Sequence, residues 1–144
     1  TTWRGRARFK DDRITDFATI NRWNPERMFE QRGSDCVVWD TITTGNFMGF
    51  DAWLDTAEGQ LQITTNHGDL EVPLQDIGIE DVTLDAGGLD RKLRAFRLPD
   101  RSLKRNVTIK RTIPLNPDGD NPVWVCVTTE DGFQAWSSPI YIFR

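Results

Sequence analysis

Apolar and basic side chains alternate along residues 3–10, and this period of two constrains the fold more than any other feature of the sequence. The apolar positions are Trp3, Gly5, Ala7 and Phe9, and the positions between them are Arg4, Arg6, Arg8 and Lys10. Successive side chains of a β-strand point to opposite faces of a sheet. The chain is therefore predicted to begin with a strand that buries one face and exposes the other.

Similar patterns recur along the chain, separated by clusters of Gly, Asn, Asp or Pro. After a turn at Asp11-Asp12, a second strand carries Ile14, Phe17 and Ile20, and a slip in its period indicates a bulge or an irregular edge. Further strands are predicted over residues 36–43, 47–54, 60–65, 70–74, 92–98 and 106–113. The clusters at 44–46, 57–59 and 66–69 have the character of hairpin connections.

The clearest predicted element is a C-terminal hairpin. Val123, Val125 and Val127 alternate, Glu-Asp-Gly at 130–132 forms the turn, and residues 133–143 return with Pro139 at an edge or a bulge. Residues 114–122 precede this hairpin and are predicted to form a rigid surface turn.

About ten short strands with almost no helix indicate an all-β fold. We expect an antiparallel β-sandwich of Greek-key type, immunoglobulin- or fibronectin-like or jelly-roll-like. One short helical turn is expected where Asn24-Pro25 leads into Met28 and Phe29. The 144 residues suit a single domain over 1–144. Because the chain starts on a strand and lacks an initiator methionine, we expect a C-terminal fragment of a longer protein.

The net charge of −4 conceals four distinct segments. Residues 1–34 sum to +3, residues 35–90 to −12 with no Lys or Arg, residues 91–111 to +8, and residues 112–144 to −3. In one interpretation, acidic strands of the middle lie beside basic strands and the opposite charges pair across the solvent face. In the other, the basic residues of both segments share a surface that docks an acidic partner or another domain.

Large aromatic side chains extend the second interpretation, because exposed tryptophans often mark contact sites or stack on sugar rings. Trp3 falls on the apolar face of the first strand and is predicted to be core. Nucleic acid is excluded as a partner, because the basic strands lack interleaved aromatics for base stacking. The candidate docking surface consists of Arg4, Arg6, Arg8, Arg94, Arg97, Trp53, Trp124 and Trp136.

Catalytic and metal-binding patterns are sparse. His67 is the one histidine and falls in a predicted turn, where we expect a solvated loop residue. The pairs Asp51/Asp55 and Asp81/Asp85 have spacings that chance explains in an acid-rich segment. Asp118-Gly-Asp120-Asn121 resembles only a fragment of a calcium loop. The chain by itself is therefore predicted to be non-catalytic, with no catalytic, cofactor-binding or metal-binding residues.

Two further features bear on the environment of the chain. Cys36 and Cys126 are interpreted as buried, reduced thiols on strands, with a disulfide between distant strands as the alternative if the protein is exported. No apolar run is long enough for a signal peptide or a transmembrane helix, so no membrane is expected as a partner. The compartment stays undetermined.

Several segments resemble one bacterial family of unknown function. They are the run DNPVWVCVTTEDGFQAWSSPIYIF from Asp120 to Phe143, Gly87–Leu93 with Arg97-Leu-Pro-Asp100, and the opening Trp3-Arg-Gly5. In that family a PHP-like (polymerase and histidinol phosphatase) metallo-hydrolase domain is followed by a β-sandwich. The likeness extends from end to end and is strongest after Gly87.

The resemblance implies that the metal-binding His and Asp residues belong to the preceding domain, so none is assigned in this chain. The chain would then be a non-catalytic accessory domain that docks on the preceding catalytic-type domain of the same polypeptide. The alternative is a carbohydrate-binding module that uses exposed tryptophans.

Overall fold

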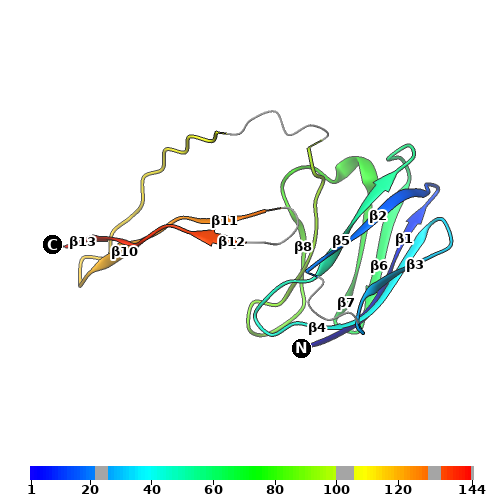
Figure 1. The fold of residues 1–144 in the computed structure, drawn as a ribbon, viewed down its shortest axis with the longest axis horizontal. Helices are drawn as coiled ribbons and strands as arrows, with labels where there is room; N and C mark the ends of the chain where they lie inside the picture. Colours follow the sequence, from blue (N-terminus) through cyan, green and yellow to red (C-terminus); the bar gives the residue numbers. More distant parts are fainter. Residues whose placement is uncertain (22–25, 100–105, 130–133, 144) are drawn as a thin grey trace. The chain divides into compact units, whose positions relative to one another are not determined.

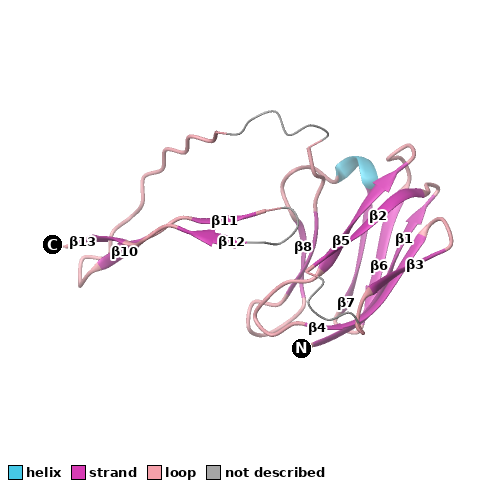
Figure 2. Cartoon of the chain, viewed as in Figure 1, coloured by secondary structure: helices cyan, strands magenta, loops and turns pink. Residues whose placement is uncertain are grey.

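A computed structural model describes residues 1–21, 26–99, 106–129 and 134–143. Within these ranges the backbone forms antiparallel strands and one three-residue 3-10 helix, η1, over Leu74–Asp76 (Figure 2). The prediction of an all-β, antiparallel, sandwich-like fold of many short strands is confirmed. The strands are β1 Thr2–Lys10, β2 Ile14–Ile20, β3 Phe29–Arg32, β4 Cys36–Ile42, β5 Gly49–Leu54, β6 Gln60–Thr65, β7 Gly68–Pro73, β8 Val82–Asp85, β9 Lys92–Ala95, β10 Asn121–Val123, β11 Cys126–Thr128, β12 Gln134–Trp136 and β13 Ile140–Ile142.

The chain divides into two compact units, Thr1–Leu98 and Pro99–Arg144. The first unit holds β1 to β9 and the second holds β10 to β13 (Figure 1). A single domain over 1–144 stays a prediction.

The central sheet of the first unit has five strands in the order β3-β4-β1-β6-β7. The first strand of the chain thus lies in the middle, paired with β4 on one side and β6 on the other. Its predicted alternation is confirmed, because Trp3, Ala7 and Phe9 are buried and the basic residues between them are exposed. Ala7 lies opposite Val37 on β4, and neither side chain is exposed at all.

A second layer covers the apolar face of this sheet. β2 pairs with β5 in a separate two-stranded sheet, and the register shift between Ile14 and Asp16 confirms the predicted bulge. The hairpin of β8 and β9 is a third sheet. Side chains from both two-stranded sheets, including Phe17, Phe50 and Leu93, pack against the core cluster. The core of the first unit therefore lies between the five-stranded sheet and these two smaller sheets.

Two predicted hairpins are wrong. Only the cluster at 66–69 joins strands that pair with each other, β6 and β7. After residues 44–46 the chain enters β5, which pairs with β2, and after residues 57–59 it enters β6, which pairs with β1. Both clusters reverse the chain, as turn residues do, but carry it from one sheet to the other.

Two other local predictions fail. Residues 106–113 form no strand, because no neighbouring strand pairs with them in the part of the chain that the structure describes. The predicted helical turn is also wrong where it can be seen: Met28 has no regular structure, and Phe29 begins β3, where it lies opposite Trp39. Asn24 and Pro25, the predicted start of that turn, lie outside the described residues.

The second unit is the predicted C-terminal hairpin, a two-stranded ribbon that we call the C-terminal ribbon (residues 121–129 and 134–143). β10 pairs with β13 and β11 with β12, both antiparallel. Pro139 lies where the two ladders are interrupted, as predicted. The turn at 130–132 lies outside the described residues. In the surface turn before the ribbon, the Asn121 amide donates to the carbonyl oxygens of Asn116 and Gly119.

Both cysteines are free thiols on strands. Cys36 on β4 is partly buried, whereas Cys126 on β11 is exposed. The interpretation of both as buried thiols is therefore wrong for Cys126, because the ribbon that carries it leaves its side chains open to solvent.

Candidate docking surfaces

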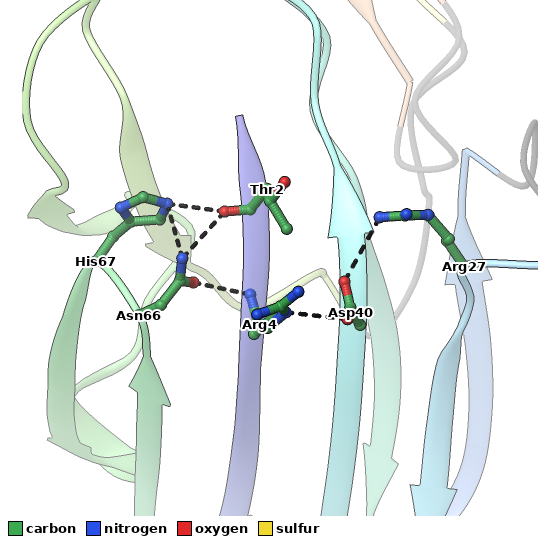
Figure 3. Close-up of polar contacts among 6 residues, drawn as sticks. All are labelled: Thr2, Arg4, Arg27, Asp40, Asn66 and His67. Carbon is green, nitrogen blue, oxygen red and sulfur yellow. Dashed lines mark hydrogen bonds and ion pairs between the residues drawn. The ribbon is translucent and has the colours of Figure 1, made fainter.

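The arginines of β1 lie together on the solvent face of the five-stranded sheet. Arg4 Nε lies 3.1 Å from Asp40 Oδ2, and Arg8 Nε lies 3.5 Å from Asp35 Oδ2. Asp40 also faces Arg27, so one carboxylate joins two guanidinium groups (Figure 3). All these groups are exposed, and pairs of this kind contribute little to stability, typically below about 1 kcal/mol each. Arg4 is thus paired with an acidic residue of the neighbouring strand and Arg8 with one in the turn before that strand, as the first interpretation of the charge segments predicts.

Arg6 differs from its two neighbours on β1. It lies opposite Val38 on β4 and Thr64 on β6, neither of which is charged. Among the described residues Arg6 has no ion-pair partner, so it is the member of this arginine row whose charge stays open to an incoming group.

The described arginines of the second basic segment that are candidates for docking, Arg94 and Arg97, lie outside the five-stranded sheet. Arg94 on β9 pairs with Asp81 at 3.0 Å, and its guanidinium lies over the rings of Phe47 and Phe96 at 5.7 and 5.9 Å. The Arg97 backbone N–H donates to the Gly78 carbonyl oxygen. Residues 101, 104 and 105 lie outside the described residues. Arg94 is therefore a member of a local packing cluster in the β8–β9 region.

The structure brings only some of the candidate residues together. Arg4, Arg6 and Arg8 share one sheet face, and Trp124 and Trp136 share the C-terminal ribbon. Trp53 lies on β5 and Arg94 on β9, in two further sheets of the first unit. The side chains of Trp53, Trp124 and Trp136 are 48%, 55% and 61% exposed.

His67 lies in a turn between paired strands, as predicted, but it is partly buried and not fully solvated. Its Nε2 lies 2.9 Å from the Thr2 carbonyl oxygen (Figure 3). Its ring meets that of Trp3 edge-on, with the ring centroids 4.7 Å apart. Since a carbonyl oxygen only accepts, Nε2 carries the hydrogen. Asn66 continues the same contact: its Nδ2 donates to Thr2 O, and its Oδ1 accepts from Arg4 N. The β6–β7 turn thus fastens the start of β1.

We expect replacement of His67 by Ala to lower the free energy of unfolding by about 1–2 kcal/mol, because it removes both a hydrogen bond and an aromatic contact. The His67→Phe variant keeps a ring beside Trp3 and should lose only about 1 kcal/mol. Urea denaturation followed by tryptophan fluorescence measures both. An unchanged midpoint for His67→Ala would show that the turn does not hold β1.

Carboxylates gather in an open cleft lined by Asp11, Asp12, Asp35 and Asp55. Burial raises the pKa of the Asp12 carboxyl, but hydrogen bonds from the backbone N–H groups of Arg13, Thr56 and Ala57 outweigh it and hold this pKa below its ordinary value. A carboxylate of this kind stays ionised at neutral pH and caps the turn. Asp55 in turn pairs with Arg13 at 2.8 Å. This arrangement suits a structural role in the turn.

The carboxylates that the sequence brought into consideration for catalysis are scattered or engaged. Asp55 and Asp81 are the acidic partners of the ion pairs with Arg13 and Arg94, and Asp85 Oδ1 accepts from Gly87 N at 2.8 Å. Within the described ranges, no three His, Cys, Asp or Glu side chains converge to hold a metal ion.

The C-terminal ribbon was predicted as a hairpin, but sequence reasoning missed its lack of charge. Residues 121–129 and 134–143 contain no Asp, Glu, Lys or Arg, although 28% of the chain is charged. Their apolar side chains are largely exposed. The most exposed are Trp124, Val125, Val127, Trp136, Ile140, Tyr141 and Phe143. The absence of charge was visible in the sequence, but its significance appears only with this exposure.

Comparisons with known proteins assign the chain to no family. No protein-family model, no curated protein and no solved structure matches the chain. Among the described residues, no helix has the length and apolar character needed to cross a membrane.

Proposed function

We propose that this chain is a non-catalytic accessory domain that attaches to another domain through its C-terminal ribbon. The observation that carries this proposal is the uncharged, exposed apolar surface of the ribbon. Exposed large apolar side chains gathered on one element of a soluble protein mark interaction sites. A two-stranded hairpin is also marginally stable alone, so further contacts are needed to hold it in one conformation.

The partner that we propose is a metal-dependent, PHP-like hydrolase domain preceding this chain in the same polypeptide. The support for this identity is the sequence resemblance, which is strongest after Gly87 and includes the ribbon. Chemistry in such a protein would belong to the preceding domain, and this chain would supply a folded β unit and an attachment element.

The test replaces both exposed indoles of the ribbon. The double variant Trp124→Ser, Trp136→Ser should bind the separately produced preceding domain at least ~30-fold more weakly, because buried tryptophans at interfaces each contribute about 2 kcal/mol or more. The matched control is Trp53→Ser, which replaces a 48% exposed indole of the first unit and should bind normally. Isothermal titration calorimetry measures both affinities. Weakening by Trp53→Ser alone would place the docking surface on β5 and contradict this proposal.

Exposed indoles also favour a second candidate, a carbohydrate-binding module, because they can stack on sugar rings. Titration of the chain with plant and bacterial glycans, followed by tryptophan fluorescence, tests it. A saturable change that disappears in the Trp124→Ser, Trp136→Ser variant would support this function. The absence of any response across the panel would reject it.

A further inference from the structure

Residues 106–113 carry the alternation of a β-strand but lack a partner. Val107, Ile109 and Ile113 occupy alternate positions, with Arg111 between them, and each of the three apolar side chains is more than half exposed. Within the described ranges the segment pairs with no strand. It therefore leaves a row of large apolar side chains open to solvent, although such rows normally mark a contact surface.

A closed turn joins this segment, the yellow trace of Figure 1, to the C-terminal ribbon. The Asn116 backbone N–H donates to Asn121 Oδ1 at 2.7 Å, and Asn121 Nδ2 donates back to the Asn116 carbonyl oxygen at 3.1 Å. The two asparagines thus meet across a loop of four residues, 117–120, a length that β-hairpins use. Residues 106–113 therefore enter the turn and β10 leaves it as the two arms of a hairpin.

The arm beyond the turn has a free edge in the part of the chain that the structure describes. β10 pairs only with β13, and β11 only with β12. The Val125 carbonyl oxygen accepts from the Ser137 N–H, so the backbone groups of Val125 face the second strand of the ribbon. Because backbone groups alternate in direction along a strand, those of Trp124 and Cys126 point to the free edge. They form a template for an added strand.

The bulge of the ribbon does not disturb this edge. Val123 lies opposite Ile140, and Val125 contacts Ser137. Two residues separate Ile140 from Ser137 on the second strand, but only one separates Val123 from Val125 on the first. The extra residue therefore belongs to the second strand, and the first strand alternates regularly from Val123 onward.

The turn also sets the register of an added strand. Counting outward from the contact between the two asparagines places Ile113 opposite Trp124 and Arg111 opposite Cys126. Trp124 and Cys126 are the residues whose backbone groups point to the free edge. Ile113 and Arg111 can supply the N–H and C=O groups that match them.

Pro114 agrees with this register. It falls opposite Val123, whose backbone groups face the same way as those of Val125 and hence away from the free edge. A residue opposite such a position donates no hydrogen bond across the pair, so the missing N–H of proline leaves no gap in the ladder.

We propose that residues 106–113 close onto the free edge of β10 and β11 as a third strand, which widens the ribbon into a three-stranded interaction surface. Cys126 and Trp136 lie opposite each other and share a face, and alternation places Trp124 on that same face. In the proposed register Ile113 joins these indoles. This inference goes beyond the proposed function, because it concerns the strand that covers the edge and holds whether or not another domain binds the face.

The segment of the same chain is the occupant that the turn favours. A short loop holds it beside the edge at a high effective concentration, whereas a second copy must be recruited from solution. After closure, Lys110 and Arg111 lie on the outer strand, where charges discourage the addition of a further chain.

A disulfide trap tests this pairing in the 144-residue chain. In a Cys36→Ser background, Arg111→Cys places a thiol directly opposite the native Cys126. Opposite residues of an antiparallel pair have Cα atoms about 5.5 Å apart, a separation that disulfides also adopt. Under mild oxidation we expect most molecules to lose both free thiols and to stay monomeric. Alkylation followed by intact-mass measurement counts the thiols, and a non-reducing gel shows the size.

Lys110→Cys in the same background is the matched control. Its side chain points to the face of the added strand opposite to that of Cys126. Both of its thiols should therefore stay free under conditions that oxidise the first variant.

Amide hydrogen exchange checks the same pairing without a substitution. The Cys126 N–H points to the free edge and is covered only if the third strand is in place. In the unaltered chain it should exchange at least ~10-fold more slowly than an unprotected amide. Exchange at the unprotected rate would overturn closure.

The trap has three results that contradict the inference. Disulfides between two molecules would assign the edge to a second copy. Equal bridging by the two variants would contradict the register, and no bridging by either would show that the edge stays open. These measurements use the chain alone, so they are independent of the calorimetric test of docking, and either proposal can fail without the other.

Discussion

The Val37→Asp variant should lose the folded state of the first unit. Val37 is fully buried on β4, opposite Ala7 of the neighbouring strand β1, and belongs to the core cluster. An aspartate there would bury a carboxylate with no cation in reach, at a cost of about 4 kcal/mol or more. The free energy of unfolding of a small domain is about 5–15 kcal/mol in total. Thermal denaturation followed by circular dichroism should therefore show either no cooperative transition or one at a much lower temperature.

Its neighbour provides the matched control. Val38 projects from the opposite face of β4, between Arg6 on β1 and Glu30 on β3. The Val38→Asp variant introduces the same carboxylate beside one opposite and one like charge, so the free energy of unfolding should change by less than about 1 kcal/mol. Equal destabilisation by the two variants would contradict the assignment of the two faces.

The second large effect is expected at Gly5. A β-carbon at this position would lie 2.6 Å from the Thr64 carbonyl oxygen and 2.7 Å from Cζ2 of the Trp39 ring, which crosses β1 there. We expect Gly5→Ala to lower the free energy of unfolding by about 2–3 kcal/mol, because either the β1–β6 pairing or the Trp39 ring must shift. Urea denaturation with tryptophan fluorescence measures this loss.

A glycine in open space and a double-mutant cycle make this test specific. No atom comes within 4 Å of a β-carbon built on Gly78, so Gly78→Ala should be nearly neutral. In a Trp39→Ala background, Gly5→Ala should cost about 1 kcal/mol less than in the native chain, since one of its two clashes is gone. Strict additivity would show that Trp39 does not occupy the space above Gly5.

The elements that could be predicted from the sequence are those that a pattern within one short segment specifies. Alternation in residues 3–10 sufficed for β1, and the period slip near Ile14 sufficed for the bulge in β2. The turn clusters at 44–46 and 57–59 indicated reversals but not the destination of the next strand, because turn residues fix local dihedral angles and not pairing. Residues 106–113 have β-branched composition without a pairing strand in the described structure, and composition alone does not make a sheet.

Features that depend on distant contacts were beyond local inference. His67 is separated from its acceptor at Thr2 by most of the first unit, so no motif marks their contact. The arginines of β1 could be placed on one face, but the pairing of Arg4 with Asp40 required the register of β1 against β4. The docking residues that the sequence grouped therefore separate into four places: the β1 row, in which Arg4 and Arg8 are paired and Arg6 is not, the β8–β9 region with Arg94 and Arg97, Trp53 on β5, and the two ribbon indoles.

The central position of β1 determines when this chain can fold during synthesis. β1 is made first, yet its two partners span residues 36–42 and 60–65. Closing such long loops delays sheet formation, and topologies rich in distant pairings fold slowly. Residues 60–65 must therefore emerge from the ribosome before β1 gains its second neighbour. Until then one edge of β1 has no paired strand. The four basic side chains on the solvent face of β1 favour solubility of the unpaired strand. They also repel the same strand of a second nascent copy.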